Sequence, residues 1–139
     1  NCYRFTAQID GRPVEALWSE PGFAKGEGRP SGSGTPILFP FPGRIGQAKF
    51  EFGGQSYTLE ANHGAHAIHG FVMERSWQVV EQTASRVKGT FQASLAEPKL
   101  LERWPADFRI SVTYELSGNR LASTIEIENP DEKPLPLPA

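Results

Sequence analysis

FRISVTYEL, residues 108–116, alternates apolar and polar side chains at every step, and this stretch decides the fold class. A period of two is the pattern of a β-strand with one buried face. The turn sequence SGNR, residues 117–120, follows it, and residues 121–128 then form a second strand-like run with Ile125 and Ile127 on one face. Two such runs joined by a glycine-containing turn predict an antiparallel hairpin.

Earlier segments carry the same pattern in shorter form. Gly53 and Gly54 separate two alternating runs, residues 48–52 and 55–59, and a two-glycine turn is a strong hairpin signal. Further strands are expected at residues 3–9, 14–18, 77–79 and 87–95. Many short strands with turn signals between them predict an all-β fold, an antiparallel β-sandwich or barrel, built as a single domain over residues 1–139.

Three segments and the chain ends depart from this pattern. Residues 20–35 are rich in Gly, Pro and Ser and predict a long irregular loop. Residues 36–40, PILFP, are an apolar run between prolines, which fits a buried edge segment better than a central strand. Residues 97–103 are the helical candidate. The chain begins in mid-strand and stops in a proline-spaced apolar segment, residues 134–139, so we expect it to be part of a larger protein.

The composition limits the kinds of partner that this chain is expected to bind. The 139 residues include 14 Lys and Arg against 16 Asp and Glu, a net charge of -2, which is typical of one globular domain. With no cluster of basic residues and no apolar run near 20 residues, we expect neither a nucleic-acid partner nor a membrane span. A single cysteine, Cys2, forms no internal disulfide, and we expect a cytoplasmic location.

Two places could carry chemistry. All the histidines, His63, His66 and His69, lie within seven residues, and their spacing leaves three interpretations: a metal site, polar loop side chains bonded to backbone, or an acid/base or sugar site at His69. We expect the loop role for His63 and His66. Arg44 follows a proline-stiffened loop, where its guanidinium could bind hydroxyls or a carboxylate, or merely cover a sheet edge.

The order of several motifs resembles the aldose 1-epimerase (galactose mutarotase) family. These motifs are GTPILFP at residues 34–40, GRI at 43–45, IHG at 68–70, and the later Trp77. The resemblance covers most of this chain but only the N-terminal half of a typical family domain. It implies a galactose mutarotase-like β-sandwich, here incomplete.

The same resemblance implies a function. The expected reaction interconverts the α and β anomers of a hexose by acid/base ring opening, without a cofactor or metal. Arg44 and His69 match family residues that contact the sugar, with His69 also catalytic, and Asn62 matches a family asparagine that we expect to bind substrate. The family's general acid, a second histidine, and its general base, a glutamate, are expected beyond Ala139, so the missing C-terminal half is an expected partner.

Two alternatives stay open. Phe71 after His69-Gly70 resembles the hexose-6-phosphate epimerase branch, in which Arg75 is a candidate phosphate ligand. A non-catalytic carbohydrate-binding β-sandwich would share the same fold. Trp77 is expected in the core, whereas Trp18 and Trp104 could equally stack on a sugar ring.

Overall fold

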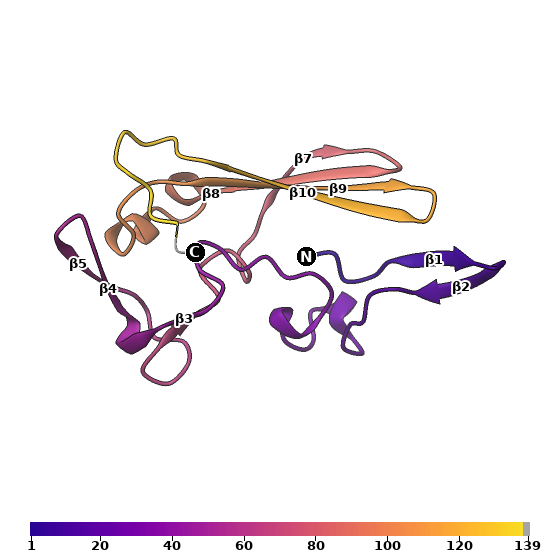
Figure 1. The fold of residues 1–139 in the computed structure, drawn as a ribbon, viewed down its shortest axis with the longest axis horizontal. Coiled ribbons are helices and arrows are strands. Elements are labelled where there is room, and N and C mark those ends of the chain that lie inside the picture. The colour runs from indigo at the N-terminus through magenta and orange to yellow at the C-terminus, as the bar shows by residue number, and fades with distance from the viewer. Residues whose placement is uncertain (138–139) are drawn as a thin grey trace.

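A computed structural model describes residues 1–137 and confirms a mostly β fold made of antiparallel sheets (Figure 1). The strands are β1 (Thr6–Ile9), β2 (Arg12–Glu15), β3 (Arg44–Ile45), β4 (Lys49–Phe52), β5 (Gln55–Thr58), β6 (Ala67–Ile68), β7 (Gln78–Gln82), β8 (Arg86–Gln92), β9 (Arg109–Ser117) and β10 (Arg120–Glu128). The helix α1 (Ala93–Ala96) and the 3₁₀ turns η1 (Phe23–Lys25), η2 (Pro30–Gly32), η3 (Gly46–Ala48) and η4 (Pro98–Glu102) connect them. No helix within residues 1–137 is long and apolar enough to cross a membrane.

The largest sheet runs in the order β10-β9-β8-β7 and contains the hairpin expected from residues 108–128. Its strands β9 and β10 pair over their whole length, with Thr113 opposite Thr124. The hairpin around Gly53 and Gly54 is also confirmed, as β4 and β5. Figure 1 shows the four-stranded sheet as one layer, with the β4–β5 hairpin on one side beneath it and the β1–β2 hairpin on the other.

The alternation of β9 separates a polar face from an apolar one. On the polar face, ion pairs cross between strands: Arg86 to Glu115 at 2.7 Å, and Lys88 to Glu126 at 2.6 Å. On the apolar face, Ile110 of β9 is buried, whereas its partner in β10, Ile127, is 44% exposed. The apolar face is therefore well covered under β9 and open along β10.

Aromatic side chains fill the core beneath this sheet. Trp104 is 1% exposed and lies 5.5 Å from the Phe71 ring and 5.0 Å from the Phe50 ring, measured between centroids. Phe39 packs edge-on against Phe108 at 5.1 Å. Each such pair contributes about 0.5–1.5 kcal/mol beyond the burial of its area. The core therefore joins the four-stranded sheet to the segments that carry β3 to β6.

The helix expected at residues 97–103 is a 3₁₀ turn, η4, and the α-helical turn lies just before it. A short α-helix, α1, begins earlier, and Pro98 starts the separate 3₁₀ turn η4. The cause is Asp107, which lies outside the helical segment: its carboxylate accepts hydrogen bonds from the backbone N–H of Ser94 at 2.9 Å and from the Ser94 hydroxyl at 2.7 Å. These bonds end β8 at Gln92 and turn the chain into α1.

The same carboxylate also accepts bonds from the Gln92 amide at 2.7 Å and the Phe108 N–H at 2.9 Å. Burial alone would raise the pKa of Asp107, but the hydrogen bonds from Ser94, Gln92 and Phe108 outweigh it and hold that pKa below its ordinary value. Asp107 is thus charged at neutral pH, and it ties β8, α1 and the start of β9 together.

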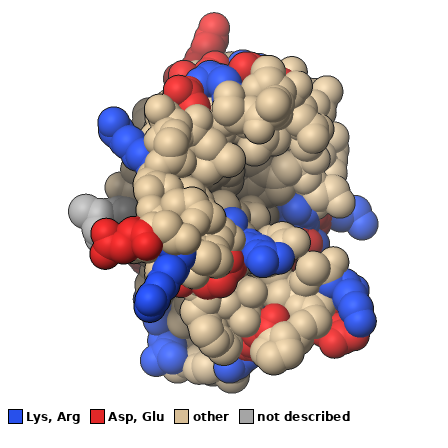
Figure 2. All heavy atoms as spheres, turned by 90° about the vertical axis from the view of Figure 1, so that its right-hand side faces the viewer, with Lys and Arg blue, Asp and Glu red and all other residues tan. Residues whose placement is uncertain are grey.

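The N-terminal hairpin docks on the sheet through Asn119, in the turn between β9 and β10. The side-chain Oδ1 of Asn119 accepts a hydrogen bond from the backbone N–H of Gln8 at 2.8 Å, and its side-chain Nδ2 donates to the backbone carbonyl of Gln8. One side chain therefore imitates the pairing of a neighbouring strand. A hollow of about 640 Å³ remains between the segment that leads into β1, residues 1–6, and the sheet. Figure 2 shows a hollowed face with acidic and basic side chains interspersed around it.

The expected strand at residues 14–18 is shifted, because β2 covers Arg12–Glu15 and includes Pro13. Proline is tolerated there because β2 is an edge strand, paired with β1 alone. The expected loop at residues 20–35 contains η1 and η2, and Ser33 fixes its end, since the buried Ser33 hydroxyl accepts a bond from the Glu20 N–H at 2.9 Å.

Candidate functional site

Two short strands bring the predicted site residues together. β3 and β6 pair antiparallel with Arg44 directly opposite Ile68, the residue that precedes His69. The ladder therefore places the backbone of Arg44 opposite the residue before His69, although 25 positions separate Arg44 and His69 in the sequence, but Arg44 is not part of the cavity lining that includes His69. The Arg44 side chain is exposed.

The backbone at His69 has an uncommon conformation. His69 has φ of +68° and Gly70 has φ of +67°, both in the left-handed region. Non-glycine residues seldom adopt this region, and such residues occur often at functional sites. Gly70 passes so close to Phe39 that a Cβ there would lie 2.0 Å from the Phe39 carbonyl oxygen, and the Phe71 N–H donates to this oxygen at 2.7 Å. Only glycine fits this position, and it fixes the direction in which the chain leaves His69.

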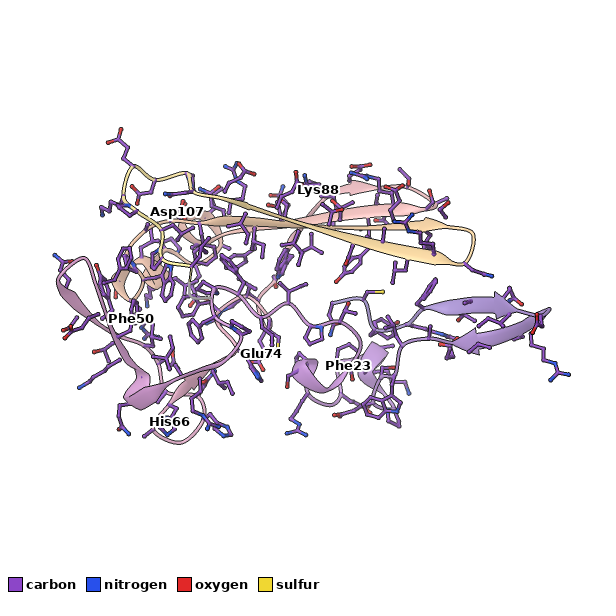
Figure 3. The ribbon with its side chains drawn as sticks, viewed as in Figure 1. Phe23, Phe50, His66, Glu74, Lys88 and Asp107 are labelled. Carbon is purple, nitrogen blue, oxygen red and sulfur yellow. The ribbon has the colours of Figure 1, made fainter. Side chains whose placement is uncertain are left out.

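His69 lines a cavity of about 240 Å³ between the β6 segment and the turn η4. The residues around it come from three separate stretches of sequence: Glu60 and Asn62 before β6, residues 67–71 and 73–75 in and after β6, and Leu100 and Arg103 in and just after η4. Figure 3 labels Glu74, one of the acidic residues of the lining. Phe71 contributes to the floor and packs edge-on against Trp104 beneath.

The charges of the cavity balance. Glu60 and Glu74 provide two negative charges and Arg75 and Arg103 two positive ones. Arg103 binds Glu60 through Nη1 at 2.5 Å. Arg75 binds Glu97, which lies outside the lining, through Nε at 2.7 Å. A neutral, polar cavity of this kind suits an uncharged ligand that carries several hydroxyl groups.

Asn62 lies at the edge of the cavity, but its amide points at the protein's own backbone. Its Oδ1 accepts a bond from the Ile68 N–H at 2.8 Å, and its Nδ2 donates to the Ile68 carbonyl at 3.0 Å. The structure therefore gives Asn62 a contact that the sequence did not indicate.

The other two histidines form the turn of the same loop. His63 and His66 bond to each other through their backbones at 3.0 and 3.1 Å. The His66 Nδ1 accepts a bond from the Gln47 N–H at 3.1 Å, at the turn that follows β3. Figure 3 shows His66 in the loop below β3, away from the four-stranded sheet. The His66 side chain is thus bonded to backbone, whereas the bonds given for His63 are those of its main chain. No group of three His, Cys, Asp or Glu able to hold a metal occurs within residues 1–137.

The tryptophans divide between core and surface. Trp77 packs against the core and donates its Nε1–H to the Val72 carbonyl at 3.0 Å, as expected. Trp104 is in the core, and its Nε1 has no hydrogen-bond partner among the described residues. Trp18 is 67% exposed. Sequence reasoning missed Glu60 and Arg103, because 43 residues separate them and no local pattern links a loop before β6 to η4.

Nearly the whole sequence matches one known protein family. The profile of the family described as aldose 1-epimerase matches residues 8–139. The chain belongs to the aldose 1-epimerase family. The resemblance drawn from residues 34–77 is confirmed.

Curated relatives of this aldose 1-epimerase family chain are much longer than it is. Galactose mutarotase of Sus scrofa is 28% identical over 94 residues, which are 68% of this chain and 27% of that protein. The uncharacterized protein YihR of Escherichia coli (strain K12) is 40% identical over 53 residues, 37% of this chain and 17% of that protein. The matched region thus spans less than a third of either relative.

Solved structures agree on the fold. A galactose mutarotase-like protein from Lactobacillus casei matches with a TM-score of 0.66 and 22% identity, over 96% of this chain and 44% of that one. A GalM/aldose epimerase homologue from C. elegans matches with a TM-score of 0.60 and 22% identity, over 81% of this chain and 34% of that one. At such identity the likeness shows the fold alone, and it confirms the predicted galactose mutarotase-like antiparallel β-sandwich.

Proposed function

We propose that this chain provides the sugar-binding side of a carbohydrate mutarotase site that interconverts the α and β anomers of a hexose. The observation that carries the proposal is His69, held in a left-handed conformation at the wall of a neutral cavity, with Arg44 opposite its preceding residue. In this role the His69 imidazole bonds to the sugar and takes part in proton transfer, and the Arg44 guanidinium donates to sugar oxygens.

The reaction needs an acid and a base as well as binding groups. A base takes the proton of the anomeric hydroxyl while an acid protonates the ring oxygen, and the ring then opens, rotates about C1–C2 and closes on the other face. No histidine follows His69 in this sequence. We therefore propose that the general acid and general base belong to the remaining part of the family domain, as the family resemblance implies.

The charge balance of the cavity supports an uncharged hexose as substrate. A hexose 6-phosphate would add roughly two negative charges at pH 7 next to the carboxylates of Glu60 and Glu74. The competing observation is that Arg75 and Arg103 line the same cavity and could face a phosphate group. Each already binds a carboxylate, so we place free hexoses before phosphorylated ones. We also propose a cytoplasmic location.

The test compares sugar binding with anomer exchange. NMR titration with galactose, glucose and glucose 6-phosphate reports binding, and magnetisation exchange between the anomeric signals reports mutarotation. We expect His69→Ala and Arg44→Ala each to lower sugar affinity or kcat/KM about 10- to 100-fold, because each removes a bond from a charged or polar group. His63→Ala, in the same loop, is the matched control and leaves both unchanged.

The outcomes separate the alternatives. Tighter binding of glucose 6-phosphate than of glucose would favour the phosphorylated substrate. Sugar binding without anomer exchange in the full-length family protein would favour a non-catalytic carbohydrate-binding sandwich. If neither His69→Ala nor Arg44→Ala alters binding or exchange, the site is placed wrongly.

A further inference from the structure

We propose that Asn62 is a positioning residue of this site, which sets the placement of both His69 and Arg44 through the backbone of Ile68. This inference rests on the proposed function, and it replaces the expected direct contact between Asn62 and substrate with an indirect role.

The contact that carries the inference is bonded in both directions. Asn62 Oδ1 accepts from the Ile68 N–H at 2.8 Å, and Asn62 Nδ2 donates to the Ile68 carbonyl at 3.0 Å. A reversed amide would set donor against donor and acceptor against acceptor, so its orientation is fixed by these partners. The side chain thus closes the loop from Asn62 to Ile68, two residues six positions apart, in the way that a paired strand would.

The two hydrogen bonds from Asn62 act on Ile68, and Ile68 adjoins both sugar-binding candidates, Arg44 and His69. It ends β6, it lies opposite Arg44 of β3, and the next residue is His69 with its φ of +68°. A left-handed residue persists only where its surroundings hold it. Fixing both backbone groups of Ile68 holds the peptide from which His69 departs.

The packing of Gly70 against Phe39 fixes the chain after His69, and on the side before His69 the hydrogen bonds from Asn62 hold the chain. β6 is two residues long, and its ladder with β3 consists of the two pairs Arg44–Ile68 and Ile45–Ala67. A ladder this short holds its strand weakly, because few hydrogen bonds offset the loss of backbone entropy. Two side-chain bonds to its terminal residue are therefore a large share of what fixes it.

The test is a double-mutant cycle on sugar binding, with D-galactose as the probe. We expect Asn62→Ala to weaken galactose binding about 10-fold, as loss of two hydrogen bonds permits. In the double variant with His69→Ala and Arg44→Ala, the added effect of Asn62→Ala falls to less than 2-fold, because the groups that it positions are gone. An undiminished 10-fold effect in that background would mean a direct contact with sugar and would overturn the proposal.

Asn129→Ala is the matched control. Its side chain also braces a turn in both directions, since Nδ2 donates to the Lys133 carbonyl at 2.9 Å and Oδ1 accepts from the Asp131 N–H at 3.0 Å. We expect galactose affinity to stay unchanged in this variant. An equal loss of affinity would mean that any loosened turn weakens binding, and would overturn the proposal.

A readout without sugar keeps this inference separate from the proposed function. The backbone and imidazole NMR signals of His69 are expected to shift in Asn62→Ala and not in Asn129→Ala. Unshifted His69 signals would overturn the positioning role, whatever the sugar data show. If His69→Ala and Arg44→Ala leave galactose affinity unchanged, the proposed function fails. The shift of the His69 NMR signals in Asn62→Ala still shows in that case whether Asn62 positions His69. Asn62→Asp keeps the acceptor for Ile68 and serves if the alanine variant does not fold, with a smaller shift expected.

Discussion

Replacing Gly70 by alanine tests how tightly the turn after His69 is built. The added Cβ would lie 2.0 Å from the Phe39 carbonyl oxygen, where ordinary contact begins at 3.4 Å. The two backbones must therefore separate by about 1.4 Å. That movement breaks the 2.7 Å bond from the Phe71 N–H to the same oxygen, a net loss of about 0.5–1.5 kcal/mol. A non-glycine residue in the left-handed region costs about 1–2 kcal/mol more. The free energy of unfolding should fall by roughly 1.5–3.5 kcal/mol.

Two other glycines separate these contributions. Gly64 also has a positive φ, +62°, but a Cβ there meets nothing within 4 Å, so Gly64→Ala tests backbone strain alone and should cost about 1–2 kcal/mol. Gly43 has neither a positive φ nor a close neighbour, and Gly43→Ala should be neutral or stabilising by less than about 1 kcal/mol.

Urea unfolding followed by tryptophan fluorescence measures all three variants against the parent protein. The expected order of stability is Gly43→Ala, then Gly64→Ala, then Gly70→Ala. If Gly70→Ala costs no more than Gly64→Ala, the close approach to Phe39 does not constrain the fold, and the account of the His69 turn is refuted.

Three further predictions concern the rest of the molecule. The pKa of Asp107 is held low in the folded protein, so its contribution to stability is complete above about pH 4 and is lost as the pH falls through the folded-state pKa. In Asp107→Asn the melting temperature should therefore fall less steeply with decreasing pH in this acid range. His66→Phe should cost about 0.5–1.5 kcal/mol in urea unfolding because it removes the acceptor of the Gln47 N–H, and His66→Asn should restore part of it. Lys88→Ala should lower stability by less than about 1 kcal/mol, since its ion pair with Glu126 is partly exposed, and a larger loss that vanishes in salt would contradict this.

The hairpins were predictable because their signals are local. The alternation of residues 108–116 and the glycine pair at 53–54 act between neighbouring residues, and both hairpins form where the sequence indicates. The helical segment expected at 97–103 forms as the 3₁₀ turn η4, and the α-helical turn before it was missed because its start depends on Asp107, a side chain from outside the segment.

The candidate site was predictable only in part. Local spacing left His69 and Arg44 open to several interpretations, and the family resemblance selected them as sugar-binding residues, which remains a proposal. The pairing of Arg44 with Ile68 and the bonds from Asn62 to Ile68 join residues across a fold that periodicity does not describe. The cavity wall formed by Glu60 and Arg103 depends on tertiary packing in the same way.

The contact between Gln8 and Asn119 sets an order of events during synthesis. The two residues are separated by 111 positions, so the β1–β2 hairpin cannot dock until the turn between β9 and β10 has been made. At about 5–20 residues per second, the ribosome needs roughly 6–22 s to make the intervening chain. Throughout that interval β1 and β2 lack their docking site. β1 and β2 are thus made well before the turn on which they dock, and slow, long-range closure of this kind is the step at which chaperones would have most to do.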